Sequence, residues 1–229
     1  RENERTQARR KQEADFVRMT SHELKTPIAS MLGLVEGMIY NVGDFRNHDK
    51  YLQQCRDILQ EQSSLVQSVL DATTLDLGEQ KDEEFDLAAV LKQHLMPSLQ
   101  MAQLKELDLE LDLEACPVRA NQTFLLKAIK NIVDNAIRYT HHGGLVRILL
   151  KDQQLLVENQ AENPLSPAEL EQVFQPFYRP DYSRAKKDGG SGIGLYLVQQ
   201  VLDKHGFPYH FEAVNGELMR FTIDFMQPE

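Results

Sequence analysis

The chain has 229 residues, of which 41% are hydrophobic and 26% are charged, so it can bury a real core and is not expected to be disordered. Its formal net charge of −10 argues against direct binding of nucleic acid, because phosphate backbones are bound by clustered lysine and arginine. The apolar runs are too short to cross a membrane, so the chain as given is expected to be soluble.

Two long helices are predicted in the first third of the chain. One runs from about Glu4 to Val42, and the second follows the turn residues Asn41, Gly43 and Asp44. Heptad spacing places the apolar positions of the first helix on two lines. One line holds Val17, Leu24, Met31 and Met38, and the other holds Ser21, Ile28 and Val35. The lines of the second helix are Leu52, Leu59 and Val66, and Cys55 and Val69. Such narrow seams predict an antiparallel hairpin that pairs with a second copy as a dimeric four-helix bundle.

The polar stretch at residues 78–84 predicts a linker, after which the periodicity changes. Helices are predicted at residues 87–105, 121–139 and 194–205. Strands are predicted at residues 107–113, 145–151, 154–158, 208–213 and 217–225, with tight turns at Asp152-Gln153 and Asn215-Gly216. This mixture of elements predicts an α/β two-layer sandwich.

The most informative segment is Phe16–Ser30, which reads FVRMTSHELKTPIAS. His22 follows a seam position by one residue, so its side chain should point sideways from the helix and be open to a second protein. Thr26 lies one turn further on the same face, and Glu23 is adjacent. A neutral imidazole keeps a free lone pair, and a neighbouring carboxylate can fix its tautomer. For an isolated His-Glu pair, a solvated surface histidine is the simpler interpretation.

A second segment, Asn131–Thr140, reads NIVDNAIRYT on a predicted helix. Asn131 and Asn135 are spaced i and i+4, so both amides project from one face, where they can meet a triphosphate and Mg²⁺. Without further support, two asparagines on a helix are more often surface residues.

Two more segments, Phe174–Arg179 (FQPFYR) and Gly189–Leu195 (GGSGIGL), bracket the polar stretch PDYSRAKKD. Glycines allow backbone N–H groups to approach a phosphate closely, and the N-terminus of the following helix favours anions. A lone glycine motif of this kind is weak evidence.

Together and in this order, the four segments resemble the boxes of sensor histidine kinases of two-component signalling systems. The resemblance runs from about Phe16 to the end of the chain. It implies a dimerisation and histidine phosphotransfer domain at residues 16–77, the linker at 78–84, and a GHKL-type catalytic ATP-binding domain at 85–229. Residues 1–15 would be a helical segment continuing from a missing upstream part, which makes the chain the cytoplasmic portion of a membrane-anchored receptor.

The resemblance also implies the chemistry. His22 would be autophosphorylated by ATP in a homodimer and would pass the phosphate to an aspartate of a cognate response regulator, with Glu23 and Thr26 as catalytic residues. Asn135 would coordinate Mg²⁺, Arg138 would contact phosphate, and Tyr139 would lie against adenine. The polar stretch between the last two segments would be a lid. The other implied ATP-binding residues are Asn131, Phe177, Arg179, Gly190, Gly192, Gly194 and Leu195.

One element of the family pattern is missing. The place expected to hold an Asp-x-Gly-x-Gly adenine box reads VENQAENPLSPAEL, with neither glycine nor aspartate. Strand alternation through Leu155 and Val157 places Asn159 where the adenine-binding aspartate should be, whereas counting back from Phe174 favours Gln160. An asparagine can accept from the adenine amino group, but more weakly than a carboxylate.

Three alternatives remain open at this stage. The protein could act mainly as a phosphatase on the phosphorylated regulator, with Thr26 orienting a water. It could be a non-enzymatic dimeric scaffold with a decayed nucleotide site. The same ATPase fold also serves mechanical enzymes such as type II topoisomerases and heat-shock chaperones, but these leave the phosphoacceptor segment unexplained.

Overall fold

A computed structural model describes residues 2–74, 81–180 and 190–226. The chain divides into two compact units between Asp71 and Ala72, and each unit is described by itself. Among the described residues, no helix is both long enough and apolar enough to cross a membrane.

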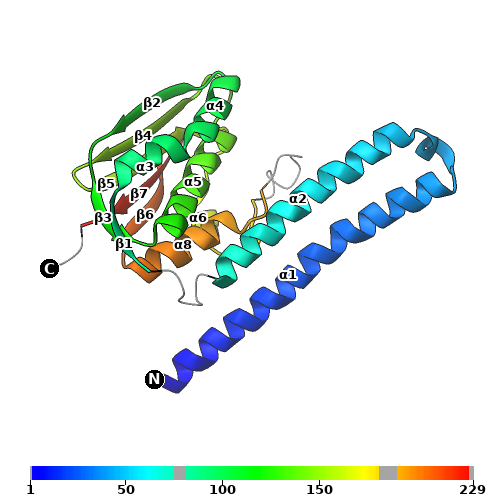
Figure 1. Cartoon of the computed structure of the whole chain (residues 1–229), viewed down its shortest axis with the longest axis horizontal. Coiled ribbons are helices and arrows are strands. Elements are labelled where there is room, and N and C mark those ends of the chain that lie inside the picture. The colour runs from blue at the N-terminus through cyan, green and yellow to red at the C-terminus, as the bar shows by residue number, and fades with distance from the viewer. Residues whose placement is uncertain (1, 75–80, 181–189, 227–229) are drawn as a thin grey trace. The chain divides into compact units, whose positions relative to one another are not determined.

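The first unit is an antiparallel helical hairpin (Figure 1). It consists of α1 (Glu2–Ile39), the short 3-10 helix η1 (Gly43–Arg46) and α2 (His48–Thr74). The chain reverses at Asn41 and Gly43, whose φ angles are 50° and 54°. At the tip, the Phe45 ring lies over Gly37, where a Cβ atom would come within 2.6 Å of the ring. The predicted hairpin is therefore confirmed, with its turn at the expected residues.

The hairpin uses only part of its apolar surface. Its buried apolar side chains, among those that the structure describes, are Phe16, Met38, Cys55 and Leu65. One predicted line of the first helix contributes to this contact, since Leu24 and Met31 are half-buried. Val69 is also half-buried. Most other seam residues are exposed within one chain, and they include Val17, Ile28, Val35, Leu52, Leu59 and Val66.

The second unit is the predicted α/β sandwich. Its described elements are β1 (Glu83–Asp86), α3 (Leu87–His94), α4 (Met96–Leu104), β2 (Asp108–Leu113), β3 (Pro117–Ala120), α5 (Gln122–Tyr139), β4 (Leu145–Lys151), β5 (Gln154–Gln160), α6 (Pro167–Leu170), α8 (Gly194–His205), β6 (Tyr209–Val214) and β7 (Leu218–Asp224). Five strands form one sheet in the order β2-β4-β5-β7-β6, in which only β2 and β4 run parallel. Strands β1 and β3 form a separate antiparallel pair.

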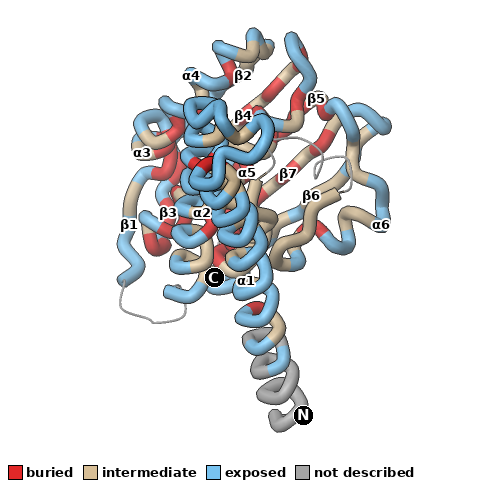
Figure 2. The backbone as a smooth tube through the Cα atoms, turned by 90° about the vertical axis from the view of Figure 1, so that its right-hand side faces the viewer, coloured by how far each residue is buried: buried red, intermediate tan, exposed pale blue. Residues whose placement is uncertain are grey.

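The core of this unit lies between one face of the five-stranded sheet and the helices. Fully buried side chains come from both layers, such as Ile129 on α5, Leu202 on α8 and Ile148 on β4. Figure 2 shows buried residues concentrated in this unit, whereas α1 and α2 are mostly exposed. Cys55 and Cys116 are both free and buried.

Most predicted elements of this unit are confirmed, including helices α5 and α8 and the strands of the large sheet. The two tight turns have left-handed backbones at both central residues, with φ of 49° and 58° at Asp152 and Gln153 and 53° and 73° at Asn215 and Gly216. Such angles belong to the turns that best match strand twist.

The structure differs from the sequence predictions for this unit in three places. The single helix expected at residues 87–105 is broken at Leu95, because Pro97 at the start of α4 has no N–H to continue the helix. Strands β1 and β3 were not predicted, and β1 begins at Glu83, inside the stretch expected to be linker. Strand β5 also continues to Gln160, two residues further than expected.

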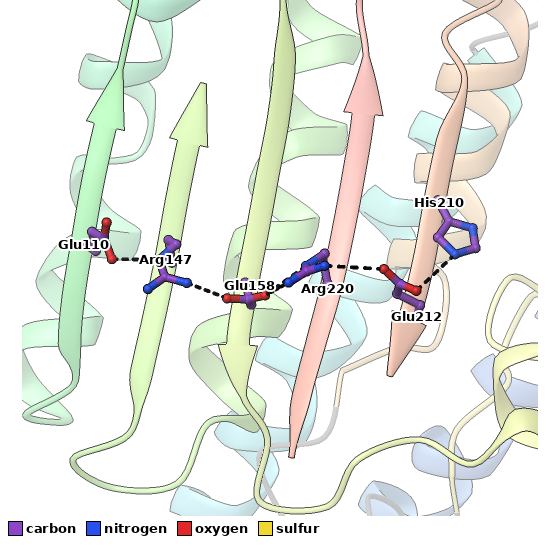
Figure 3. A network of polar contacts seen from close by, with 6 residues as sticks. All are labelled: Glu110, Arg147, Glu158, His210, Glu212 and Arg220. Atoms are coloured by element: carbon purple, nitrogen blue, oxygen red, sulfur yellow. Dashed lines mark hydrogen bonds and ion pairs between the residues drawn. The ribbon is translucent and has the colours of Figure 1, made fainter. Parts of the chain in front are cut away.

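The other face of the large sheet carries a row of alternating charges (Figure 3). Glu158 of β5 is at its centre, with a side chain only 2% exposed. Its two carboxylate oxygens each lie 2.7 Å from a guanidinium nitrogen, one of Arg147 on β4 and one of Arg220 on β7. Arg147 also donates to Glu110 of β2 at 2.7 Å, which raises the pKa of its guanidinium. A buried carboxylate is held here by two cations from neighbouring strands.

Candidate active site

His22 lies on the exposed surface of α1. Its side chain is 80% exposed, and its Nδ1 atom lies 3.7 Å from a carboxylate oxygen of Glu23. The Thr26 hydroxyl donates to the backbone carbonyl of His22 at 3.3 Å, and α1 continues without a break through Pro27. The imidazole is therefore open to a second protein, as predicted, with a carboxylate on its Nδ1 side.

In the second unit, α5 and the glycine-rich segment before α8 lie against one another. A Cβ atom at Gly194 would lie 3.6 Å from the side-chain oxygen of Asn131, and one at Gly190 would lie 2.5 Å from a guanidinium nitrogen of Arg138. The first amide and the cation of the second segment thus meet the glycines of the fourth. A Cβ atom at Gly190 would force the Arg138 guanidinium to move, whereas one at Gly194 would make only an ordinary van der Waals contact with Asn131.

The third segment also joins this assembly. The backbone N–H of Phe177 donates to the carbonyl of Gly192 at 2.9 Å, and a Cβ atom at Gly192 would lie 2.8 Å from the Phe177 backbone. Gly192 has a φ of 73°, so both the space and the backbone conformation require glycine. Phe177 itself has a φ of 65°, which a non-glycine residue rarely adopts.

The remaining predicted ATP-site residues are placed as follows. Asn135, Tyr139 and Arg179 are half-buried, and Leu195 packs partly against the core. Residues 181–189, which hold nearly all of the predicted lid, lie outside the described residues.

The two candidates for the missing adenine contact, Asn159 and Gln160, have different hydrogen-bond partners in the structure. Asn159 is 6% exposed, and its Nδ2 atom donates to the Thr140 hydroxyl at 3.1 Å. Gln160 instead uses its side-chain oxygen to accept from the backbone of Leu145 at 3.4 Å. Asn159 is thus the one of the two whose side chain reaches the C-terminal end of α5.

Two residues that support this end of α5 were missed by the sequence reasoning. Lys105 donates from Nζ to the carbonyl oxygens of Ile137, Arg138 and Thr140 at 2.8, 2.9 and 3.1 Å. A cation at this position satisfies carbonyls that the helix leaves unpaired and opposes the negative end of its dipole. Thr140 is 2% exposed and forms the C-cap of α5. No local pattern links Lys105 to residues more than 30 positions away, although Thr140 ends the second segment.

The residues present fit a nucleotide-borne metal better than a metal held by protein alone. Among the described residues, no group of three or more histidine, cysteine, aspartate or glutamate side chains is placed to hold a metal ion. The amides of Asn131 and Asn135 are hard oxygen ligands on one face of α5. Mg²⁺ prefers such ligands and is usually carried by substrate phosphates, with few ligands from the protein.

The chain thus combines an exposed histidine on a helical hairpin with an α/β sandwich that has a glycine-lined helix terminus. Residues 12–78 match the family described as "His Kinase A (phospho-acceptor) domain". Residues 120–228 match the family described as "Histidine kinase-, DNA gyrase B-, and HSP90-like ATPase". The chain belongs to the sensor histidine kinases, and the predicted family is confirmed.

Individual proteins agree with this assignment. The chain is 33% identical over 217 residues to Sensor protein VanSB of Enterococcus faecalis, an alignment that covers 91% of this chain and 48% of the relative. It therefore spans about half the length of the curated relatives it matches.

Solved structures show the same fold. Histidine kinase AdeS of Acinetobacter baumannii has a TM-score of 0.68 at 24% identity, over 88% of this chain and 95% of that one. Histidine kinase ThkA, solved in complex with response regulator protein TrrA, has a TM-score of 0.70 at 19% identity, over 98% of this chain and 66% of that one.

Proposed function

We propose that the chain is the kinase portion of a sensor that transfers the γ-phosphate of ATP to His22 and then to an aspartate of a response regulator. The observation that carries the proposal is the 80% exposed His22 side chain in a matched phosphoacceptor domain of a chain that also contains a matched ATPase domain. Most of the chemistry in phosphoryl transfer is positioning and electrostatic stabilisation, so an accessible, correctly oriented nucleophile is the main requirement on the acceptor side.

The imidazole of His22 is the nucleophile. The Glu23 carboxylate lies on the Nδ1 side, where it favours a proton on Nδ1 and leaves the lone pair on Nε2. Nε2 attacks the γ-phosphorus, the bond from the γ-phosphorus to the bridging oxygen breaks, and ADP leaves. Glu23 stabilises the positive charge that develops on the ring. In the second step a carboxylate oxygen of the regulator attacks the phosphorus and the P–N bond breaks.

The nucleotide is held by the second unit. Arg138 supplies a cation beside Gly190, and the glycine-lined N-terminus of α8 supplies backbone N–H groups for the phosphates. Asn135 would hold Mg²⁺, which when bound neutralises phosphate charge, and Asn131 would contact the nucleotide. Tyr139 and Asn159 would contact the adenine, and Phe177, Arg179, Gly192, Gly194 and Leu195 complete the candidate set.

The exposed seam of the hairpin supports a homodimer. Apolar side chains that one hairpin leaves in water, such as Ile28 and Leu59, need a partner, and a second copy offers the same seam. A response regulator is the second partner, and the ThkA–TrrA complex supports this choice. We further propose that the chain is the cytoplasmic portion of a membrane-anchored receptor, with residues 16–77 as the phosphotransfer domain and an ATP-binding domain that begins at β1 (Glu83–Asp86) instead of at residue 85.

The test is incubation of the purified chain with γ-labelled ATP and Mg²⁺. Wild-type chain should gain acid-labile phosphate, and His22→Gln should gain none while binding ATP normally, because acceptor and nucleotide site lie on different units. His48→Gln changes another exposed histidine of the hairpin and should be labelled like the wild type. Persistent acid-labile label on His22→Gln would show that another histidine is the acceptor.

Asn135→Ala should sharply lower the rate of labelling, because the metal and triphosphate lose a protein ligand. Thr123→Ala, an exposed position near the start of the same helix, is the control. A wild-type rate for Asn135→Ala at saturating nucleotide and Mg²⁺ would remove Asn135 from the site.

Phosphatase activity on the phosphorylated regulator is a second candidate function, because the Thr26 hydroxyl shares the exposed face of His22. Thr26→Ala should slow dephosphorylation of the regulator more than labelling of His22, and Thr26→Ser should retain both. Equal losses in the two reactions would indicate damage to the helix instead.

A further inference from the structure

Two consecutive buried hydrogen bonds lie at the C-terminal end of α5, the helix proposed to bind the nucleotide. Thr140 and Asn159 are 2% and 6% exposed. The Thr140 hydroxyl donates to the carbonyl of Ala136 at 2.6 Å, and Nδ2 of Asn159 donates to that hydroxyl oxygen at 3.1 Å. These bonds join α5 to strand β5, which carries Asn159 between Val146 of β4 and Met219 of β7.

The chemistry of the chain fixes the direction of the Asn159 amide. A hydroxyl has one proton, and a carbonyl oxygen can only accept, so the proton of Thr140 is committed to Ala136. The Thr140 oxygen can then only accept, and the atom that faces it must be the amide nitrogen of Asn159. With the amide turned around, two acceptors would face each other in a buried setting, with no proton between them.

The other end of the amide is available for a ligand. Oδ1 of Asn159 makes no hydrogen bond with any residue in the described part of the chain. Oδ1 of Asn159 is not among the buried side-chain atoms that lack a hydrogen-bond partner in the described part of the chain, so it is accessible to solvent and an N–H group of a bound ligand can reach it. The site thus presents an acceptor whose orientation is set by a second residue.

We propose that Thr140 sets the nucleobase specificity of the ATP site by holding Oδ1 of Asn159 toward the base. This inference rests on the proposed ATP-binding function and adds a positioning residue to it. The 6-amino group of adenine donates to Oδ1, whereas the 6-oxo group of guanine places a second acceptor against it. If the side-chain amide of Asn159 could rotate freely, it would bind both bases, because Nδ2 can donate to the 6-oxo group of guanine. Selectivity therefore depends on Thr140 and not on Asn159 alone.

The experiment compares non-hydrolysable analogues of ATP and GTP by calorimetric titration of the full chain with Mg²⁺. Wild-type chain should prefer the ATP analogue. Thr140→Val keeps the shape of the side chain but removes the acceptor, so the ratio of the two affinities should fall about tenfold, the factor expected for one exchanged hydrogen bond. Thr140→Ser keeps the hydroxyl and should keep the wild-type ratio.

A double variant separates orientation from structural damage. Asn159→Asp replaces the amide by a carboxylate that has no donor face, so in the Thr140→Val background it should restore the preference for the ATP analogue. Damage to the fold by Thr140→Val would persist in the double variant and would lower both affinities equally.

An unchanged ratio in Thr140→Val, an equal loss for both analogues, or failure of the double variant to restore the preference would each overturn the inference. These results differ from a failure of the proposed function, in which the wild-type chain would bind neither analogue.

Discussion

The two units of the chain treat their apolar side chains in opposite ways. In the α/β unit the largest core residues, such as Leu91, Ile129 and Leu202, are completely buried. In the hairpin, Ile39 is 67% exposed and Leu59 56% exposed, although both lie on long helices with regular apolar spacing. One unit closes a core within a single chain, and the other leaves half of its seam open.

This difference indicates the source of stability in each unit. A sheet covered by helices excludes water from its own core, so its stability should not depend on protein concentration. A two-helix hairpin has too little interior to do the same, and most helical stability in proteins comes from packing an apolar face. The hairpin should therefore gain stability by mass action with a second copy.

The largest expected effect comes from placing a charge in the open seam. Leu59→Glu would put a carboxylate into an apolar interface in both copies, so dimer affinity should fall by about 100-fold or more, as expected for burying an unpaired charge. Sedimentation velocity over a range of concentrations measures this directly.

Leu104→Glu is the matched control for the seam. Leu104 is 78% exposed on α4 of the other unit, so the same substitution there should leave association unchanged. Equal dimer affinity in wild type and Leu59→Glu would place the interface elsewhere.

The same contrast explains what the sequence could predict. Heptad spacing marked the hairpin because both seams repeat along long helices, and paired turn residues marked the strands of the large sheet. Strands β1 and β3 have four residues each, too few to show a period. The break at Leu95 was predictable in principle, since Pro97 cannot continue a helix, but the apolar spacing on both sides of it suggested one element.

In the candidate site, the sequence could predict the local segments but not the long-range contacts that support them. The segments around His22, Asn131 and Gly190 could be found because each is local in sequence. The support for the site is not local, since Lys105 reaches the carbonyls of α5 across more than 30 residues. Glu158 was predicted only as the end of a strand, because its two arginine partners come from neighbouring strands that no local pattern pairs with it.

A smaller effect, confined to the α/β unit, should follow from removing both partners of Glu158. The double variant Arg147→Met/Arg220→Met leaves a 2% exposed carboxylate without its cations. The free energy of unfolding should fall by about 3 kcal/mol or more, the cost of an uncompensated buried charge. Urea unfolding of this unit, followed by its tertiary signal, measures the loss, and dimer affinity should not change.

Lys151→Met is the control for this pair. Lys151 lies on the same strand as Arg147 and pairs with Asp112 at 2.6 Å, but both side chains are about half exposed. Water replaces a lost partner there, so little stability should be lost. A loss for Lys151→Met as large as for the double variant would mean that burial of Glu158 does not decide the cost.

The smallest expected effect is a dependence on pH that also belongs to the α/β unit alone. His94 lies on α3, where burial lowers its pKa from 6.5, assisted by the nearby charge of Lys130 and opposed by that of Asp134. Its Nε2 atom is buried without a hydrogen-bond partner among the described residues. As the pH falls below 6.5, the unfolded chain takes up a proton that the folded chain resists, so the stability that His94 contributes at neutral pH is progressively lost until the pH passes the folded pKa.

His94→Gln removes this difference, so between pH of about 7 and 5 the variant should lose less stability than the wild type. Urea midpoints measured across that range decide the matter, with His141→Gln, an exposed loop position, expected to follow the wild type. Parallel curves for wild type and His94→Gln would show that another group is responsible for any loss of stability on acidification.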